Sequence, residues 1–420
     1  MLVMGGIIGT GIFMNPYVVA QRVHTPALVL SAWLAGGLIA LTAGFIWAEL
    51  ADRMPSVGGQ YAYLREAYHP LVAFLYGWVL LLVIQTGGMA AVTVTFSRYF
   101  LELTGLQAND WQVAALVLTL LTVINCLGVR AGGTVQSALM VLKILAIALL
   151  VFAGAFLVRG HIPWKPLLDQ PISPGLFSSF GAAMIPVVFA YGGWQTASFA
   201  AGEMKNPRRD LPRALVIGVI GVALCYTSVN YVCVRALGVA TLEHTPTPAS
   251  AVMRLALGER GATVIALGIA ISTLGFLSQS VLTAPRVYFA MARDGLFFRQ
   301  LGQVHPRTQA PMLAIAIQSV WTMVILLSGR YDKILNYVVS IDAIFWALTA
   351  GCLFVLRRRD PARSAFSMPG HPFTTALFCL VCLAVVGNTV YQFPENTLIG
   401  LGILAAGVPM YYIWKRTSRA

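Results

Sequence analysis

Long apolar segments separated by short polar ones follow one another along the whole chain. The apolar runs are continuous and do not alternate with polar positions, so they indicate helices rather than strands. A helix needs about 20 apolar residues to cross the hydrocarbon core of a bilayer. The pattern predicts twelve membrane-spanning helices, with approximate limits at 1–22, 27–52, 71–104, 111–129, 134–158, 176–203, 213–236, 262–290, 311–328, 333–356, 373–393 and 397–415.

Composition places most of the 420 residues in lipid. Hydrophobic residues make up 58% of the chain and charged residues 10%, and the mean hydropathy is +0.78, whereas soluble domains are about a quarter charged. Because backbone groups in lipid must be hydrogen-bonded within the protein, we expect an all-α polytopic membrane protein. The polar stretches near 159–174 and 238–260 are only loop-sized, so residues 1–420 are expected to form a single transmembrane domain.

The formal net charge of +13 does not indicate nucleic-acid binding, because the basic residues lie in short loops between apolar runs. With the N-terminus in the cytoplasm, 18 Lys and Arg residues fall on the cytoplasmic side and 9 on the other. Membrane proteins show this bias. We therefore expect a multi-pass protein of the plasma (inner) membrane with both termini cytoplasmic. No cleavable signal peptide is visible.

Two predicted spans contain glycines near the middle of the membrane. The first reads GGIIGTGIFMNP at Gly5–Pro16, and the sixth reads FAYGGWQ at Phe189–Gln195. Glycine lets the backbone leave the helical region at little steric cost. The two breaks are five spans apart, as in secondary transporters built from inverted repeats. We expect such repeats over about 1–158 and 176–356, and two peripheral helices over about 373–415.

A break in a membrane helix suits a zwitterion. It frees amide N–H groups on one half-helix and carbonyls on the other, so a carboxylate fits the first and an ammonium the second. An α-amino acid carries both groups. The Gly5-x-x-x-Gly9 spacing alone is more typical of close helix packing, but the paired break in span six favours a binding site. A nucleotide loop is excluded because no strand precedes these glycines.

Several stretches, which together cover nearly the whole chain, resemble the amino acid–polyamine–organocation (APC) superfamily of transporters. They are GGIIGTGIF, AELADRMPSVGGQYAYLREAYHPLVAFLYGW at Ala48–Trp78, FAYGGWQ with EMKNPRRDLPRAL, and PRVYFAMARDGLFF at Pro285–Phe298. FAYGGW and Lys143 are most similar to the L-type amino acid transporters and their bacterial relatives. The resemblance implies ten helices in two inverted repeats with broken helices one and six, two peripheral helices, and alternating access around a central site.

The resemblance also implies where a substrate binds. Its carboxylate would accept hydrogen bonds from the amides of span one, at Gly9, Thr10 and Gly11. Its ammonium would face carbonyls of both breaks, at Ile7, Phe189, Ala190 and Gly192.

Side-chain recognition would involve residues beyond the breaks. The resemblance implies that the Phe189 ring closes over the substrate and that Trp194 and Gln195 lie near the side-chain pocket. Gln85 and Thr86 of span three are further candidates for that pocket.

Lys143 lies inside a predicted span with no acidic neighbour in sequence, and an intramembrane charge indicates function. Related sodium-coupled transporters hold an ion between spans one, five and eight. The resemblance therefore implies that the Lys143 ammonium replaces sodium, bonding carbonyls of span one and the hydroxyl of Ser272. Snorkelling to an interface is the alternative, and proton coupling through Lys143 stays open.

Asp342, in span ten, occupies a position where the family often has a small polar or amide residue. If Asp342 faces the cavity, it favours a polar or cationic substrate side chain or carries a proton. If it pairs with another group of the protein, it is structural. The sequence leaves these alternatives open.

The expected function is sodium-independent transport of neutral L-amino acids by exchange or facilitated diffusion. The alternatives are a proton-coupled symporter and a carrier of cationic amino acids or amines. An enzyme is not favoured, because the six histidines lack ligand spacing and no serine has a G-x-S-x-G context. A channel is not favoured either, because no ring of charges is evident. We expect no cofactor and no metal.

The expected partners are the amino acid substrate and the lipid bilayer. Animal L-type transporters pair with a glycoprotein through a cysteine between spans three and four, but Tyr99–Asp110 contains no cysteine. No disulfide-linked subunit is therefore expected. Glu49 and Glu203, at the cytoplasmic ends of spans two and six, are expected to form ion pairs with loop arginines. Relatives usually carry a longer first half-helix and a cytoplasmic tail, so a trimmed or misassigned start is expected.

Overall fold

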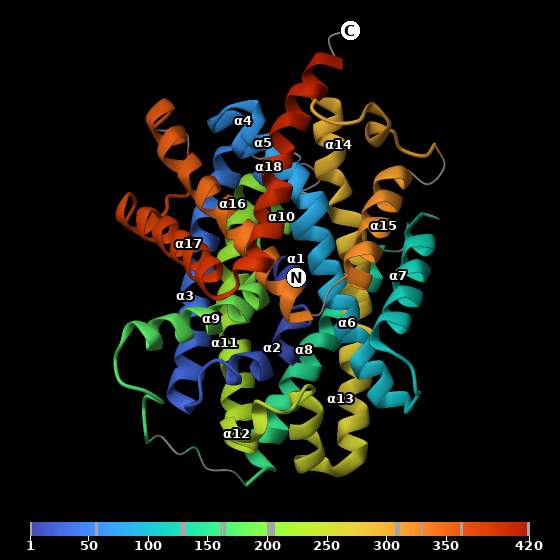
Figure 1. Cartoon of the computed structure of the whole chain (residues 1–420), viewed down its shortest axis with the longest axis vertical. Helices are drawn as coiled ribbons and strands as arrows, with labels where there is room; N and C mark the ends of the chain where they lie inside the picture. Colours follow the sequence, from blue (N-terminus) through green and yellow to red (C-terminus); the bar gives the residue numbers. More distant parts are fainter. Residues whose placement is uncertain are drawn as a thin grey trace.

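The computed structural model describes residues 2–54, 58–126, 132–159, 162, 165–199, 206–306, 311–328, 331–361 and 364–417, and most of these residues lie in helices that turns and loops connect. No β-strand occurs in these ranges, so the expected all-α class is confirmed. Figure 1 shows most helices running roughly along the long axis, with the C-terminus at the upper end and the N-terminus near the centre.

The first half of the chain contains α1 (Leu2–Ile7), α2 (Gly11–Ala20), α3 (Pro26–Arg53), α4 (Gln60–Ala67), α5 (Pro70–Val79), the π-helix η1 (Leu80–Ile84), α6 (Gln85–Thr104), α7 (Asp110–Cys126), α8 (Gly132–Phe156), α9 (Pro174–Tyr191) and α10 (Thr196–Phe199). The second half contains α11 (Pro207–Leu237), α12 (Val239–Leu242), α13 (Pro248–Thr283), α14 (Pro285–Arg293), the 3₁₀-helix η3 (Arg299–Gly302), α15 (Met312–Ser328), α16 (Tyr331–Arg359), α17 (Phe373–Gln392) and α18 (Pro394–Thr417).

Within the described ranges, eight helical segments are long and apolar enough to cross a membrane, namely Pro26–Arg53, Pro70–Thr104, Pro174–Ser198, Arg209–Leu237, Pro248–Arg293, Lys333–Arg359, Phe373–Gln392 and Pro394–Lys415. Four shorter helices are also apolar, namely Gly11–Ala20, Asp110–Cys126, Val141–Phe156 and Met312–Leu327. Each overlaps one of the twelve predicted segments, and Pro248–Arg293 begins 14 residues before the predicted 262–290. The polytopic character is thus supported, while the number of crossings stays a prediction.

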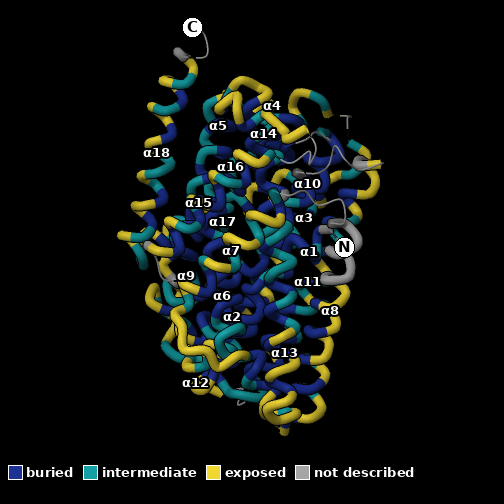
Figure 2. The backbone as a smooth tube through the Cα atoms, turned by 90° about the vertical axis from the view of Figure 1, so that its right-hand side faces the viewer, coloured by how far each residue is buried: buried dark blue, intermediate teal, exposed yellow. Residues whose placement is uncertain are grey.

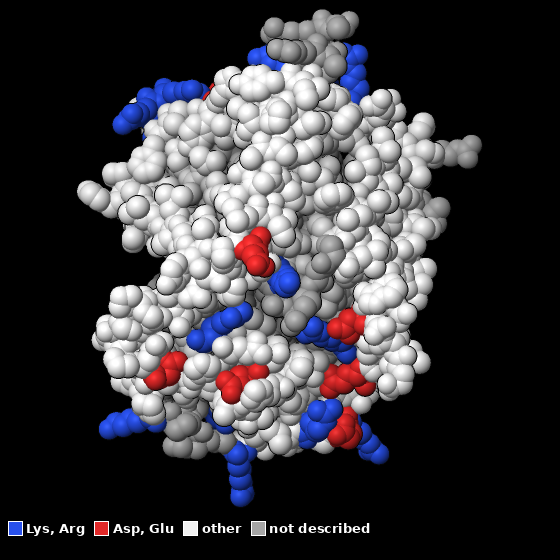
Figure 3. Space-filling view, in the orientation of Figure 1, with Lys and Arg blue, Asp and Glu red and all other residues white. Residues whose placement is uncertain are grey.

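Burial and charge both fit a lipid-facing bundle. Figure 2 shows buried segments along the middle, around α2 and α6, and exposed ones at the periphery. Large apolar side chains point outward, including Phe156, Phe177 and Leu38, which are 75%, 69% and 68% exposed. Soluble monomers rarely expose extensive apolar surface. Figure 3 shows a band without charged side chains between the basic upper end and a lower part with both signs.

Both glycine-containing segments are interrupted helices, and their breaks lie against each other. The first break separates α1 from α2, and the second separates α9 from α10. Gly193 has a φ of +112°, a conformation that favours glycine, and a Cβ there would collide with the Gly6 carbonyl oxygen. A Cβ on Gly11 would lie 2.7 Å from the Cα of Ala190. These glycines therefore permit the breaks and also the close approach of the two helices.

The upper end of α3 is tied to α16 by ion pairs around the fully buried Glu49 carboxylate. Glu49 Oε1 accepts from Arg53 Nε at 2.8 Å, and Glu49 Oε2 accepts from Arg357 Nη2 at 2.6 Å. The Met368 amide also donates to Glu49 Oε2, at 2.7 Å. The ion pairs expected of Glu49 are thus present, whereas Glu203 lies outside the described residues.

Replacing Gly11 by alanine tests the contact between the two breaks. The added Cβ should push α2 away from α9, because the obstructing atoms at 2.7 and 2.8 Å belong to Ala190 itself and cannot rotate aside. We expect a loss of about 1–3 kcal/mol in the free energy of unfolding. Thermal unfolding of purified protein measures it. Gly387→Ala on α17, where a Cβ meets no atom within 4 Å, is the matched control, and equal stability of the two variants would contradict the contact.

Candidate functional site

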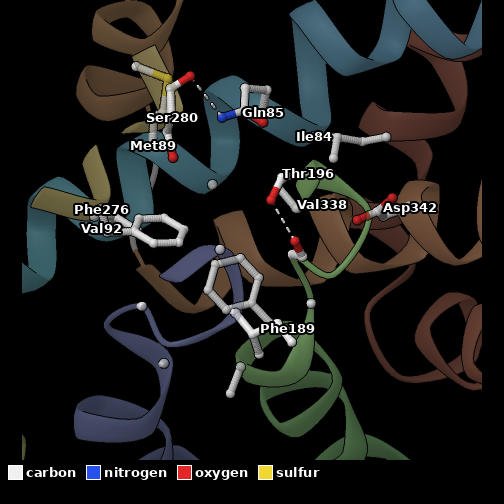
Figure 4. Close-up of a pocket in the computed structure, with 18 of the residues that line it drawn as sticks. Ile84, Gln85, Met89, Val92, Phe189, Thr196, Phe276, Ser280, Val338 and Asp342 are labelled. Atoms are coloured by element: carbon white, nitrogen blue, oxygen red, sulfur yellow. Dashed lines mark hydrogen bonds between the residues drawn. The ribbon is translucent and has the colours of Figure 1, made fainter. Parts of the chain in front are cut away.

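A cavity of about 100 Å³ lies where the two breaks meet. Its walls come from α1, α2, α6, α9, α13 and α16 and from the unwound segments. Figure 4 shows side chains from these elements converging on it. One water needs roughly 10–15 Å³ of such space, so the cavity has room for a small solute. Ten predicted site residues line it, namely Ile7, Gly9, Thr10, Gly11, Gln85, Phe189, Ala190, Gly192, Gln195 and Asp342.

The N-terminus of α2 presents free hydrogen-bond donors to this cavity. The backbone bonds of the described residues include none from the amides of Thr10 and Gly11, and the buried Thr10 hydroxyl has no partner there either. The Gly9 amide differs from the expectation, because it donates to the Ile7 carbonyl at 2.7 Å. The first turn of a helix favours negative charge. This corner of the cavity therefore suits a carboxylate.

The carbonyl side of the breaks is held by Tyr226, which the sequence analysis missed. Its hydroxyl, on α11, lies 3.0 Å from the Ile7 carbonyl oxygen and 3.2 Å from that of Ala190. A hydroxyl donates one hydrogen, so Tyr226 can serve only one of these two carbonyls at a time. A signal existed in the sequence, since a buried tyrosine hydroxyl inside an apolar span needs a partner.

Polar side chains of the second break form hydrogen bonds with its own backbone. The Gly193 amide donates to Gln195 Oε1 at 3.1 Å, and the Thr196 hydroxyl donates to the Gly193 carbonyl at 2.7 Å. Gln195 thus lines the cavity with its carbonyl oxygen already engaged. Trp194 is fully buried and does not line the cavity, and its ring centroid lies 4.7 Å from that of Trp346, which does.

The π-helix in span three orients Gln85 and Thr86 differently. A π-helix often occurs at functional sites. Gln85, directly after η1, lines the cavity and donates to the Ser280 carbonyl at 3.4 Å. The Thr86 hydroxyl is buried and donates back to the Leu81 carbonyl at 2.8 Å, and Thr86 is not among the lining residues. Of the two candidates on span three, the structure brings only Gln85 to the cavity.

Asp342 reaches the cavity from α16 (Figure 4). It is only 7% exposed, and the contacts of the described residues include neither an ion pair nor a hydrogen bond of its carboxyl group. A buried carboxylate without a partner is energetically costly. The alternative in which Asp342 pairs with another group of the protein therefore finds no support in the described residues.

Lys143 lies behind the break rather than in the cavity lining. It is 4% exposed, and its ammonium donates to the Ile8 carbonyl, as expected for a span-one carbonyl. The Phe276 ring on α13 lies beside it, with its centroid 5.7 Å from Lys143 Nζ. Ser272 is buried, but no hydrogen bond between it and Lys143 is found among the described residues. Burial against the break argues against snorkelling of Lys143 to an interface.

In the described part of the chain, no group of three or more His, Cys, Asp or Glu side chains lies close enough together to hold a metal ion. The cavity instead combines backbone donors, backbone acceptors and an aromatic wall.

A bundle of apolar helices around a small cavity, with two interrupted helices meeting there, defines a polytopic membrane transporter. The sequence model of the amino acid permease family matches residues 1–412. The chain belongs to this family of the APC superfamily, and it is a transporter rather than an enzyme.

Relatives agree with this assignment. The serine/threonine exchanger SteT of Bacillus subtilis is 34% identical, over 99% of this chain and 95% of its own length. The human large neutral amino acids transporter small subunit 2 is 29% identical, over 98% of this chain and 78% of its own length. The human cystine/glutamate transporter is 29% identical, over all of this chain and 85% of its own length.

Removing the Tyr226 hydroxyl should impair the central site while leaving the fold intact. Tyr226→Phe keeps the ring but leaves buried carbonyls with one donor fewer, a change that costs about 1–3 kcal/mol. We expect amino acid uptake into liposomes to fall by about fivefold or more. Tyr231→Phe, on the same helix with Tyr231 42% exposed, is the control. Uptake by Tyr226→Phe equal to that of the control would refute the role of this hydroxyl.

Proposed function

We propose that this protein carries neutral L-amino acids across the plasma (inner) membrane without sodium, by exchange or facilitated diffusion. The polytopic fold would comprise twelve spans with both termini cytoplasmic, ten of them in two inverted repeats and two peripheral. In this orientation the cytoplasmic side has twice as many Lys and Arg residues as the other side. The cytoplasmic end of α16 would then carry Arg357, Arg358 and Arg359, as the positive-inside bias predicts.

The observation that carries the proposal is the pairing of free amides and hydrogen-bonded carbonyls around one small cavity. A substrate carboxylate would bind the Thr10 and Gly11 amides and the Thr10 hydroxyl at the N-terminus of α2. Its ammonium would share the carbonyls of Ile7 and Ala190 with Tyr226. The Phe189 ring, which Figure 4 shows at the cavity between the two breaks, would close over the substrate.

Sodium independence rests on Lys143. Its ammonium already lies on a carbonyl of the unwound segment, which is where a coupling cation would be coordinated in sodium-dependent relatives. A fixed positive charge makes a second cation at the same place unfavourable. Proton coupling through Lys143 or Asp342 is the alternative mechanism.

No disulfide-linked subunit is proposed, since the segment between α6 and α7 has no cysteine. One relative is named as a small subunit. For this chain we propose that the amino acid and the lipid bilayer are the partners.

Transport by purified protein in liposomes tests the coupling. Uptake of labelled amino acid should change less than about twofold with a sodium or a proton gradient. A requirement for unlabelled amino acid inside the liposomes would assign exchange, and gradient-independent uptake without it would assign facilitated diffusion. Lys143→Ala should lower uptake by about tenfold or more, because the Ile8 carbonyl loses its buried charged donor. Lys333→Ala, at an exposed position, is the control. Uptake into empty liposomes driven by a proton gradient would instead establish a symporter.

A second candidate substrate class follows from the Asp342 carboxyl group, which has no hydrogen bond or ion pair with any described residue. It would accept a hydrogen bond from a substrate hydroxyl or ammonium, which extends the specificity towards polar or cationic side chains. One relative exchanges serine and threonine.

Isosteric substrates and variants distinguish these classes. Asp342→Val should lower the preference for threonine over valine by about tenfold or more, because the acceptor is lost. Asp342→Asn keeps an acceptor and should retain that preference. Uptake of 2,3-diaminopropionate that disappears in Asp342→Asn would assign the cationic class. Thr349→Val, a buried site on α16 outside the cavity lining, is the control, and an unchanged preference in Asp342→Val would exclude Asp342 from specificity.

A further inference from the structure

Phe276 contacts both the substrate cavity and the surroundings of Lys143. Its half-buried side chain lines the cavity from α13, and Figure 4 shows its ring at the cavity wall, near Phe189. The ring centroid also lies 5.7 Å from Lys143 Nζ. Ring carbons also lie 3.4–3.5 Å from where a Cβ on Gly9 would be. One ring thus meets the cavity, the break in span one and the buried ammonium.

The Lys143 ammonium has more donors than partners. It carries three N–H donors, and one of them bonds the Ile8 carbonyl. Among the described residues, Lys143 makes no other hydrogen bond and no ion pair. A desolvated cation is attracted by the face of an aromatic ring. The Phe276 ring is therefore the second favourable neighbour of this charge.

The surroundings of Phe276 keep the ring in place. It packs against the buried side chains of a small cluster drawn from α6, α7, α13 and α15, namely Met89, Val92, Leu118, Leu277, Val281 and Ile315. The Phe276 ring, which contacts the break in span one and the Lys143 ammonium, therefore also packs against other helices.

We propose that Phe276 is a positioning residue that closes Lys143 off from the substrate cavity and holds its ammonium on the Ile8 carbonyl. A solute in the cavity then contacts the ring and the amides of α2, but not the ammonium. This inference deepens the proposed function, because it makes Lys143 a fixed part of the break that does not exchange with the cavity water.

Chemical accessibility of Lys143 tests the barrier without any transport assay. Purified protein is methylated with formaldehyde and a borane reductant, and each lysine is quantified by peptide mass spectrometry. The exposed Lys165 reports reagent activity. We expect Lys143 to be protected in the wild type and in Phe276→Tyr, and its methylation to rise by about tenfold or more in Phe276→Ala, where the shielding ring is removed.

Phe189→Ala is the matched control, because it removes a second aromatic ring from the cavity lining without opening the side that faces Lys143. Lys143 should stay protected in this variant. Methylation of Lys143 in the wild type, continued protection in Phe276→Ala, or equal exposure in Phe189→Ala would each overturn the proposal.

A double-mutant cycle tests the contact itself. Thermal unfolding is measured for Phe276→Leu, Lys143→Met and the double variant. If the ring acts on the ammonium, Phe276→Leu should lower Tm less in the Lys143→Met background than in the wild type. Additive shifts would show that the ring only fills space. Failure of the wild type to transport any amino acid would refute the proposed function and leave both of these tests intact.

Discussion

A peptide group that leaves its helix at membrane depth must find a hydrogen-bond partner inside the protein, and this requirement organises the centre of the molecule. The Lys143 ammonium donates to the Ile8 carbonyl, and the Tyr226 hydroxyl lies within reach of the carbonyls of Ile7 and Ala190 and donates to one of them at a time. The amides of Thr10 and Gly11 have no such partner among the described residues. The protein thus places its own donors beside these carbonyls and leaves the amides of Thr10 and Gly11 for a ligand. The cavity is therefore prepared more strongly for a carboxylate than for an ammonium.

Much of this site could be predicted from the sequence, because the glycines that break a helix act locally. A break lies at or next to the glycine that permits it, so the sequence identifies the position directly. This holds for Gly9, Gly11 and Gly192, which all line the cavity. The direction of a side chain on a regular helix was harder to predict. Thr86 was a candidate, but its hydroxyl bonds back to Leu81 across the π-helix, and sequence spacing assumes an α-helical turn.

The contacts that Tyr226 and Phe276 make with the first break could not be derived from the sequence. Tyr226 and Phe276 lie in apolar spans where an aromatic residue is ordinary, and their roles come from what the folded chain brings beside them. Phe276 meets Lys143, 133 positions earlier in the chain, only because α13 packs against α8. Long-range packing of this kind leaves no periodic trace in the sequence.

The hydrogen bonds and ion pairs between helices also limit how the molecule moves. At its upper end, α3 is joined to α16 and to the segment before α17 through Glu49, and Asp52 adds hydrogen bonds from the amides of Ala365 and Phe366. At the centre, the broken helices bond α11 through Tyr226 and are contacted from α8 by Lys143. Alternating access requires one group of helices to rock against another around a fixed site. A movement of α3 with the broken helices would therefore carry α16 and the segment before α17 along, or break the ion pair between the buried Glu49 carboxylate and Arg357. Breaking such a pair is strongly destabilising, so the α3–α16 connection favours movement of these helix ends as one unit.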